Sequence, residues 1–290
     1  MVDVGEVELC VESFGDPARP TLLLVSGAAA SMDWWEVEFC RRLADAGRHV
    51  IRYDHRDTGR STTGKPTAPT YGGWQLSRDC ANLIDALAVG PVHLVGISMG
   101  GGIGQWIAVQ RPRLLATLTL ISTTAVSGVD RDVLPGPSPA VRASFDSPPP
   151  DPDWADVRSY ADWVVAGQSS LAGKIALDVP RLRALAATVH ARSTDPAAAN
   201  NHWLVVGGGG DDDDEVEDEP IDPRRIATPT LVMHGSDDPL FPLPHGQALA
   251  AAIPDATLVI IPGMGHQVPP TETWDLVIRA LLQHTRGFEE

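Results

Sequence analysis

Residues 96–100 read Gly-Ile-Ser-Met-Gly, and this stretch decides the fold. An apolar run, residues 91–95, precedes it, and a segment that begins Gly-Gly-Ile-Gly-Gln-Trp at residue 101 follows it. This order predicts a strand, a sharp turn and a helix, with Ser98 at the apex of the turn. Glycine is needed two residues before and after the apex, because side chains there would collide with the neighbouring strand and helix. The stretch therefore predicts a serine hydroxyl that is exposed as a nucleophile.

The composition is that of a globular enzyme with an acidic surface. The chain has 290 residues, of which 43% are hydrophobic, and a formal net charge of −16. Eight acidic residues within residues 211–219 account for half of that charge. A nucleic-acid partner is excluded, because phosphate binding needs a basic face.

Nothing in the sequence indicates a metal, a disulfide framework or a membrane segment. Cys10, Cys40 and Cys80 are widely spaced, which fits no zinc motif and predicts free buried thiols. The N-terminus lacks the pattern of a signal peptide, and no apolar run reaches the ~18 residues of a membrane helix. We expect a cytoplasmic protein without membrane insertion, whose oligomeric state the sequence does not indicate.

Strands and helices alternate along most of the chain. A mostly parallel central sheet flanked by helices on both faces is the fold class that this alternation predicts. The expected strands are residues 7–13, 21–25, 49–53, 91–95, 114–122, 230–233 and 257–261. The expected helices are residues 35–46, 76–88, 247–252 and 272–284, together with a helix that follows the turn and ends near residue 110.

The alternation is interrupted between residues 123 and 220. Proline clusters at residues 135–150 are followed by segments of helical composition, residues 154–166 and 172–189. We therefore expect a core of residues 1–122 and 221–290 with an inserted, mainly helical cap, residues 123–220. Within it, residues 207–219 read as a disordered acidic loop without the spaced ligands of a calcium site.

A serine nucleophile needs a base and a carboxylate, which follow it along the chain in the order acid, then histidine. Residues 262–266 read Pro-Gly-Met-Gly-His directly after the last strand, so His266 is the expected base. Residues 234–239 read His-Gly-Ser-Asp-Asp-Pro and offer two acids. Asp238 is favoured over Asp237 because the following proline restrains its backbone. The segment after the preceding strand, residues 122–124, contains no carboxylate.

Two backbone amides are expected to form an oxyanion hole, which stabilises the charge that develops on the carbonyl oxygen. One is the amide of Met99, which follows the nucleophile. The other comes from residues 26–30, Ser-Gly-Ala-Ala-Ala, after the first long buried strand, where Ala28 is the expected donor.

Together the four loops resemble those of the α/β-hydrolase superfamily, over the whole chain. Residues 51–62, 244–246 and 261–266 are further similar to actinobacterial hydrolases of the aclacinomycin methylesterase type. The resemblance implies an α/β-hydrolase fold and ester hydrolysis without a metal or organic cofactor. It assigns the triad roles to Ser98, Asp238 and His266. Residues 26–28 depart from the glycine-rich loop of that group, and the cap also differs, so its polyketide methyl ester specificity is not implied.

The expected function is therefore a serine hydrolase that cleaves carboxylic esters of a small to medium hydrophobic substrate through an acyl-enzyme. A small-molecule ester is the only expected partner. A lactonase, a thioesterase, a carbon–carbon bond hydrolase and a cofactor-free perhydrolase are alternatives, because they use the same triad. A non-catalytic ligand sensor on this scaffold is an alternative of a different class. We interpret the charged stretch 54–61 as structural, held by local hydrogen bonds and an ion pair from Arg56.

Overall fold

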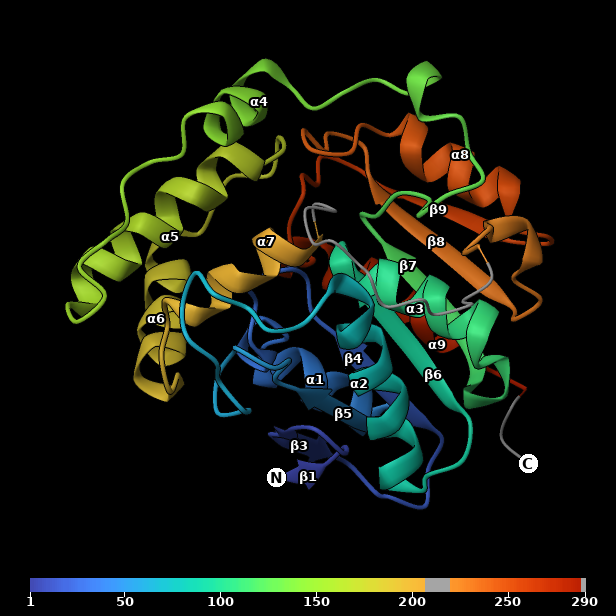
Figure 1. The fold of residues 1–290 in the computed structure, drawn as a ribbon. Helices are drawn as coiled ribbons and strands as arrows, with labels where there is room; N and C mark the ends of the chain where they lie inside the picture. The colour runs from blue at the N-terminus through green and yellow to red at the C-terminus, as the bar shows by residue number, and fades with distance from the viewer. Residues whose placement is uncertain (207–219, 288–290) are drawn as a thin grey trace.

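The computed structural model describes residues 1–206 and 220–287, which contain a seven-stranded sheet (Figure 1). The acidic run, for which we expected a disordered loop, lies outside these residues. The strand order is β3-β5-β4-β6-β7-β8-β9, and only β3 is antiparallel to its neighbour. The strands are β3 (Val11–Phe14), β4 (Thr21–Val25), β5 (His49–Tyr53), β6 (Val92–Ile97), β7 (Leu115–Ile121), β8 (Thr230–Gly235) and β9 (Thr257–Ile261), and a separate pair is formed by β1 (Val2–Asp3) and β2 (Glu8–Leu9).

The central strands are buried on both faces, which explains their continuous apolar sequences. In β4, Leu23 and Val25 point to one apolar cluster and Leu22 and Leu24 to the other, because successive side chains alternate across a strand. The first cluster includes side chains from α2 (Gly73–Leu87), α3 (Met99–Gln110) and α8 (Pro244–Ala252), and the second includes side chains from α1 (Val37–Asp45) and α9 (Trp274–His284). The expected fold class is thus confirmed.

In the described residues between β7 and β8 there are four α-helices; the first three form one side of the molecule in Figure 1, and the fourth extends toward its centre. A small apolar cluster that includes Tyr160, Val164 and Val189 joins the two longest of them. We call this insertion the cap; the assignment of residues 123–220 as one unit stays a prediction. Its helices are α4 (Pro139–Asp146), α5 (Val157–Leu171), α6 (Val179–Arg192) and α7 (Asn201–Val206).

The cap helices differ from the sequence expectation at their ends. A helix beginning at residue 172 is wrong, because α6 begins only at Val179. The Asp178 side chain caps α6 by accepting from the Arg181 amide, and Pro180 occupies the first turn. Residues 172–178 instead form a connection that reaches the active-site loops, as described below.

Candidate active site

The turn at Ser98 has the strained geometry that the sequence predicts. Ser98 has φ of 52° and ψ of −118°, a conformation that few non-glycine residues adopt. A Cβ at Gly96 would overlap the Gly100 carbonyl oxygen, and one at Gly100 would overlap the Val25 carbonyl oxygen of β4. Glycine at both positions lets the strand and helix approach closely, so the serine projects beyond the end of β6.

The structure brings Ser98, His266 and Asp238 together in one hydrogen-bonded chain. His266 Nε2 lies 3.0 Å from Ser98 Oγ, and His266 Nδ1 lies 2.9 Å from Asp238 Oδ2. Asp238 Oδ1 accepts from the amides of Leu240 and Phe241, at 2.9 and 2.8 Å. These two amides orient the carboxylate. With the Nδ1 proton donated to Asp238, Nε2 is free to accept a proton from the serine.

Asp237 points away from the histidine. Its carboxylate pairs with Lys174 of the cap at 2.7 Å and accepts from the Ser236 hydroxyl. These two hydrogen bonds, that of Lys174 first, lower the pKa of Asp237. Of the two adjacent aspartates, Asp237 is therefore paired with the cap, and Asp238 reaches His266.

His234, at the end of β8, lies behind Asp238. Its Nε2 donates to the Phe241 carbonyl oxygen at 2.7 Å and is 3.7 Å from Asp238 Oδ2. Burial lowers the pKa of this imidazole, which favours its neutral form. His234 therefore supports the turn that carries the Asp238 carboxylate. It is not a member of the hydrogen-bonded chain that joins Ser98, His266 and Asp238.

The cap packs backbone against backbone on the histidine loop, residues 262–266. The His266 amide donates to the Leu171 carbonyl oxygen at 2.8 Å, and the Ile175 amide donates to that of Gly263 at 3.0 Å. A Cβ at Gly265 would overlap the Leu171 oxygen and the Gly173 amide. The sequence analysis did not predict this contact. The glycines on either side of Met264 could have indicated it, because glycine often marks a place where another backbone segment approaches closely.

The two expected oxyanion donors flank the serine. Met99 is the first residue of α3, whose amide has no acceptor within the helix. A Cβ at Gly27 would lie 3.4 Å from Ser98 Cβ, so the oxyanion loop, residues 26–30, runs beside the nucleophile. Outside helices and strands, the amides of Ala28 and Met99 donate to no backbone carbonyl of the described residues. Their role as oxyanion donors stays a prediction.

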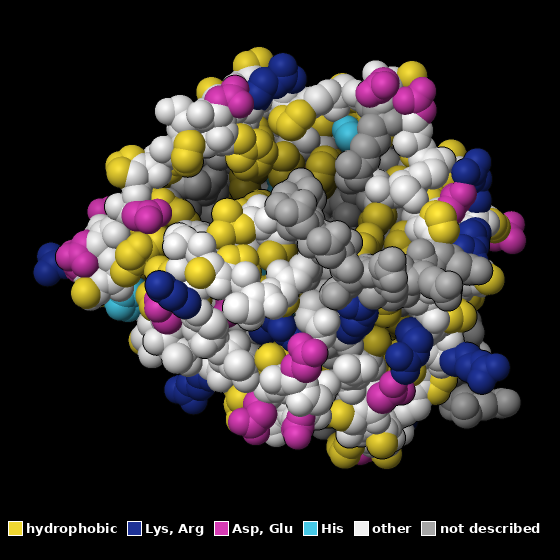
Figure 2. All heavy atoms as spheres, in the orientation of Figure 1, with side chains coloured by type: hydrophobic (Ala, Val, Ile, Leu, Met, Phe, Trp, Pro, Cys, Tyr) yellow, Lys and Arg dark blue, Asp and Glu magenta, His cyan; other side chains and the backbone are white. Residues whose placement is uncertain are grey.

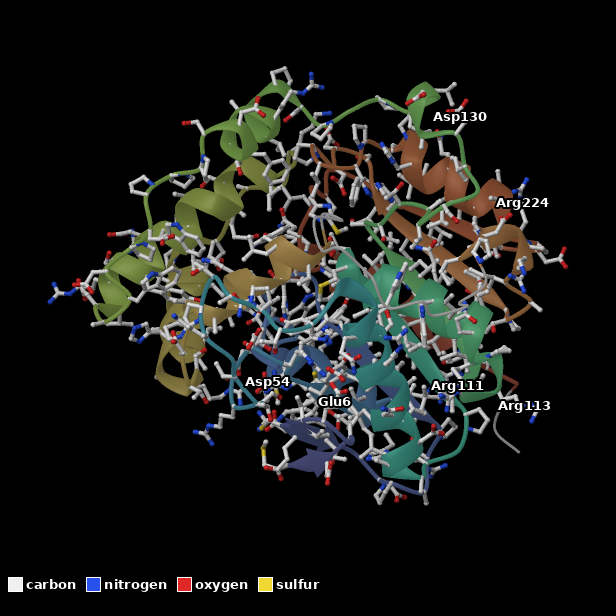
Figure 3. All side chains as sticks on the ribbon, viewed as in Figure 1. Glu6, Asp54, Arg111, Arg113, Asp130 and Arg224 are labelled. Carbon is white, nitrogen blue, oxygen red and sulfur yellow. The ribbon has the colours of Figure 1, made fainter. Side chains whose placement is uncertain are left out.

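The charged stretch after β5 is held by buried ion pairs. Arg56 donates to both oxygens of Asp79, at 2.5 and 2.7 Å, and its guanidinium lies over the Tyr71 ring. Asp54, labelled in Figure 3, accepts from Arg192 of α6 at 2.6 Å, although burial raises the pKa of its carboxyl. The expected Arg56–carboxylate pair is present, and the Asp54 pair additionally ties the cap to the core.

In Figure 2, hydrophobic side chains gather where the surface is hollowed between the cap and the core. A separate groove with about 740 Å³ of empty space runs beside the histidine loop, and Ser98 is not among its lining residues. Its walls come from α5, α6 and the segment after His266, together with Trp34, Trp35 and Trp274.

Two further features bear on cofactors and membranes. In residues 1–206 and 220–287, no three His, Cys, Asp or Glu side chains are grouped so as to hold a metal ion. No helix in the same ranges combines the length and the apolar character needed to cross a membrane. The three cysteines are free thiols.

The chain matches known proteins over nearly its whole length. The family model described as alpha/beta hydrolase fold matches residues 20–273. Rhodomycin D methylesterase DauP from Streptomyces sp. (strain C5) is 33% identical, over 99% of this chain and 98% of that protein. A putative carbamate hydrolase, RutD from Pseudomonas savastanoi pv. phaseolicola, is 30% identical over 85% of this chain and 86% of its own length.

Solved structures agree on the fold. The 2-hydroxy-6-oxo-6-phenylhexa-2,4-dienoate hydrolase (BphD) of Rhodococcus sp. strain RHA1 superposes with a TM-score of 0.72 at 19% identity, covering 98% of this chain and 96% of that one. The resemblance inferred from the sequence motifs is confirmed by the family model and by the methylesterase relatives. The chain belongs to the alpha/beta hydrolase family.

Proposed function

We propose that this protein is a serine hydrolase that cleaves carboxylic esters through an acyl-enzyme intermediate. One observation carries the proposal: the hydrogen-bonded chain from Ser98 Oγ through His266 to Asp238, with distances of 3.0 and 2.9 Å. A serine hydroxyl is a weak nucleophile, and a histidine oriented by a carboxylate is the base that activates it.

In the proposed acylation, Ser98 Oγ attacks the ester carbonyl carbon and its proton passes to His266 Nε2. Asp238 stabilises the resulting imidazolium, and the amides of Ala28 and Met99 donate to the oxyanion of the tetrahedral intermediate. The intermediate collapses as the C–O bond to the leaving group breaks, and the departing alkoxide takes the proton from Nε2.

Deacylation repeats these steps with water. His266 Nε2 removes a proton from a water molecule, which attacks the acyl carbon, and the second tetrahedral intermediate releases Ser98 Oγ. The proton returns to the serine and the carboxylic acid leaves.

The names of the relatives bear on the substrate class. Two relatives at 33% and 32% identity over 99% of the chain are named methylesterases, which supports an ester of a small alcohol. The hydrophobic side chains around the hollow in Figure 2 support an apolar acyl part. A cytoplasmic location stays a prediction.

Carbamate hydrolysis is a second candidate, because relatives at about 30% identity carry that name. The same triad would attack a carbamate carbonyl. The lactonase, thioesterase, carbon–carbon bond hydrolase, perhydrolase and ligand-sensor alternatives share the triad as well, and a substrate panel separates them.

The test is the hydrolysis of p-nitrophenyl acetate and butyrate by the wild type and by Ser98→Ala. We expect kcat to fall by about 10⁴-fold or more, because the variant lacks the nucleophile. Equal rates in the two proteins would refute the proposal. Labelling of Ser98 by a fluorophosphonate without turnover of any ester, carbamate or lactone would favour the ligand sensor.

A further inference from the structure

We propose that His202, a cap residue, is a positioning residue that sets the oxyanion loop for the transition state. The inference rests on the proposed function and extends it to the cap. The Ala29 amide donates to His202 Nδ1 at 3.0 Å, across 173 residues of sequence. Ala29 directly follows Ala28, whose amide is the proposed oxyanion donor.

The hydrogen-bond partners of His202 determine which ring nitrogen carries the proton. Its Nε2 lies 2.9 Å from the Arg56 carbonyl oxygen, which can only accept, so Nε2 is protonated. Nδ1 is then the bare nitrogen that accepts from Ala29. The side chain is fully buried, and burial lowers its pKa, which keeps the ring neutral and Nδ1 an acceptor.

The loop is held in a conformation that it would not favour alone. Ala29 has φ of 58°, in the left-handed region that an alanine rarely occupies. Three other bonds hold the loop: from His55 Nε2 to the Ser26 carbonyl at 3.2 Å, from the Ser26 hydroxyl to the Ser31 carbonyl at 3.3 Å, and from the Ala30 amide to the Gly27 carbonyl at 3.3 Å. The His202 bond is the shortest of these four and acts on the peptide next to the proposed donor.

The docking of α7 does not depend on this bond. Asn201 Nδ2 donates to Asp57 Oδ2 at 2.9 Å and to the Lys65 carbonyl at 3.1 Å. His202 Nε2 adds the bond to Arg56 on the same loop. Removing only the Nδ1 acceptor should therefore leave α7 in place while releasing Ala29, which separates positioning from folding.

Two substitutions test the two ring nitrogens of His202 separately. Asparagine places its Oδ1 near the position of Nδ1, so His202→Asn keeps an acceptor for Ala29 and loses the bond to Arg56. Glutamine places its Nε2 near the ring Nε2, so His202→Gln keeps the bond to Arg56 and loses the acceptor. His190→Gln is the matched control, because His190 is another cap histidine bonded to a backbone carbonyl, that of Trp154.

With p-nitrophenyl butyrate we expect His202→Gln to lower kcat by about 10–100-fold with KM within about threefold, since loss of a whole oxyanion donor costs about 10²–10³-fold. We expect His202→Asn to stay within about fivefold of wild type and His190→Gln to be unchanged. Rates are normalised to active sites titrated with a fluorophosphonate, so that misfolded protein is not counted.

Wild-type kcat in His202→Gln, or equal losses in the Asn and Gln variants, would overturn the inference. Should His202→Gln fail to fold, His202→Ala takes its place in the comparison with His202→Asn, because alanine also lacks the acceptor for the Ala29 amide. We then expect kcat to fall by about 10–100-fold in the alanine variant only; equal kcat in the alanine and asparagine variants contradicts the proposal. Failure of the proposed function itself is seen separately, as ester hydrolysis that does not require Ser98.

Discussion

Replacing Asp238 with asparagine should nearly abolish activity without unfolding the protein. Asp238 Oδ1 accepts from two amides, those of Leu240 and Phe241. An asparagine at this position must present its oxygen to these two donors, so its NH₂ group faces His266 Nδ1. The imidazole can then bond only by losing the Nδ1 proton, which moves the proton to Nε2.

A protonated Nε2 cannot accept the proton of Ser98. The same carboxylate-to-amide change in a serine protease costs about 10⁴-fold in kcat. Because each tenfold is about 1.36 kcal/mol, we expect a loss of roughly 4–5.5 kcal/mol of transition-state stabilisation, or about 10³–10⁴-fold. The two amide bonds are retained, so the thermal midpoint should shift by only a few degrees.

The assay is kcat for p-nitrophenyl butyrate, with the thermal midpoint measured on the same samples. Asp237→Asn is the control, because Asp237 faces Lys174 and Ser236 instead of the histidine. We expect this variant to keep kcat within about threefold. The reasoning is refuted if Asp238→Asn retains more than a tenth of the activity, or if the two variants lose activity equally.

Two further predictions concern the contacts between cap and core. Gly265→Ala forces a Cβ onto the backbone of Leu171 and Gly173, so we expect a loss of about 3 kcal/mol in urea unfolding and a marked loss of activity. The control is Gly167→Ala in α5, where the new Cβ meets open space, so stability should be unchanged or slightly higher. Equal losses of stability in the Gly265 and Gly167 variants would show that the close approach at Gly265 does not matter. Arg192→Met leaves the buried carboxylates of Asp54 and Asp33 without the cation that they share and should cost about 3–5 kcal/mol near pH 7. Because burial already raises the pKa of Asp54 in the folded state, its ionisation opposes folding above the unfolded pKa of about 3.9. The deficit of the variant should therefore grow as the pH rises and shrink toward pH 4, measured as urea midpoints across that range. As a control on the same helix, Arg183→Met breaks an exposed pair with Asp162 and should change stability by about 0.5 kcal/mol or less. If the stability loss in Arg192→Met is equally small, or does not change with pH, Asp54 does not depend on Arg192.

The core of the fold could be predicted from local sequence. Strands β4, β5 and β9 have the expected bounds, because β4 is buried on both faces and needs a continuous apolar run, while β-branched residues mark β5 and β9. The turn at Ser98 was equally predictable. Its glycines are required because a side chain there would collide with backbone within a few residues of the serine or in the adjacent strand. The start of α6 was predicted seven residues too early because the prediction used composition alone, although Asp178 and Pro180 mark the start of this helix locally.

The same difference between local and long-range contacts applies to the candidate site. Sequence order and loop position alone selected Ser98 and His266, and the proline after Asp238 favoured it over Asp237. The tertiary structure adds the physical reason, because Lys174 attracts the Asp237 side chain and two amides orient that of Asp238. His202 had no local signal at all, since its partner Ala29 is 173 residues away. Sequence determines a residue's role where its partners are its neighbours in the chain; where the partner comes from a distant segment, only the folded packing of cap on core decides it.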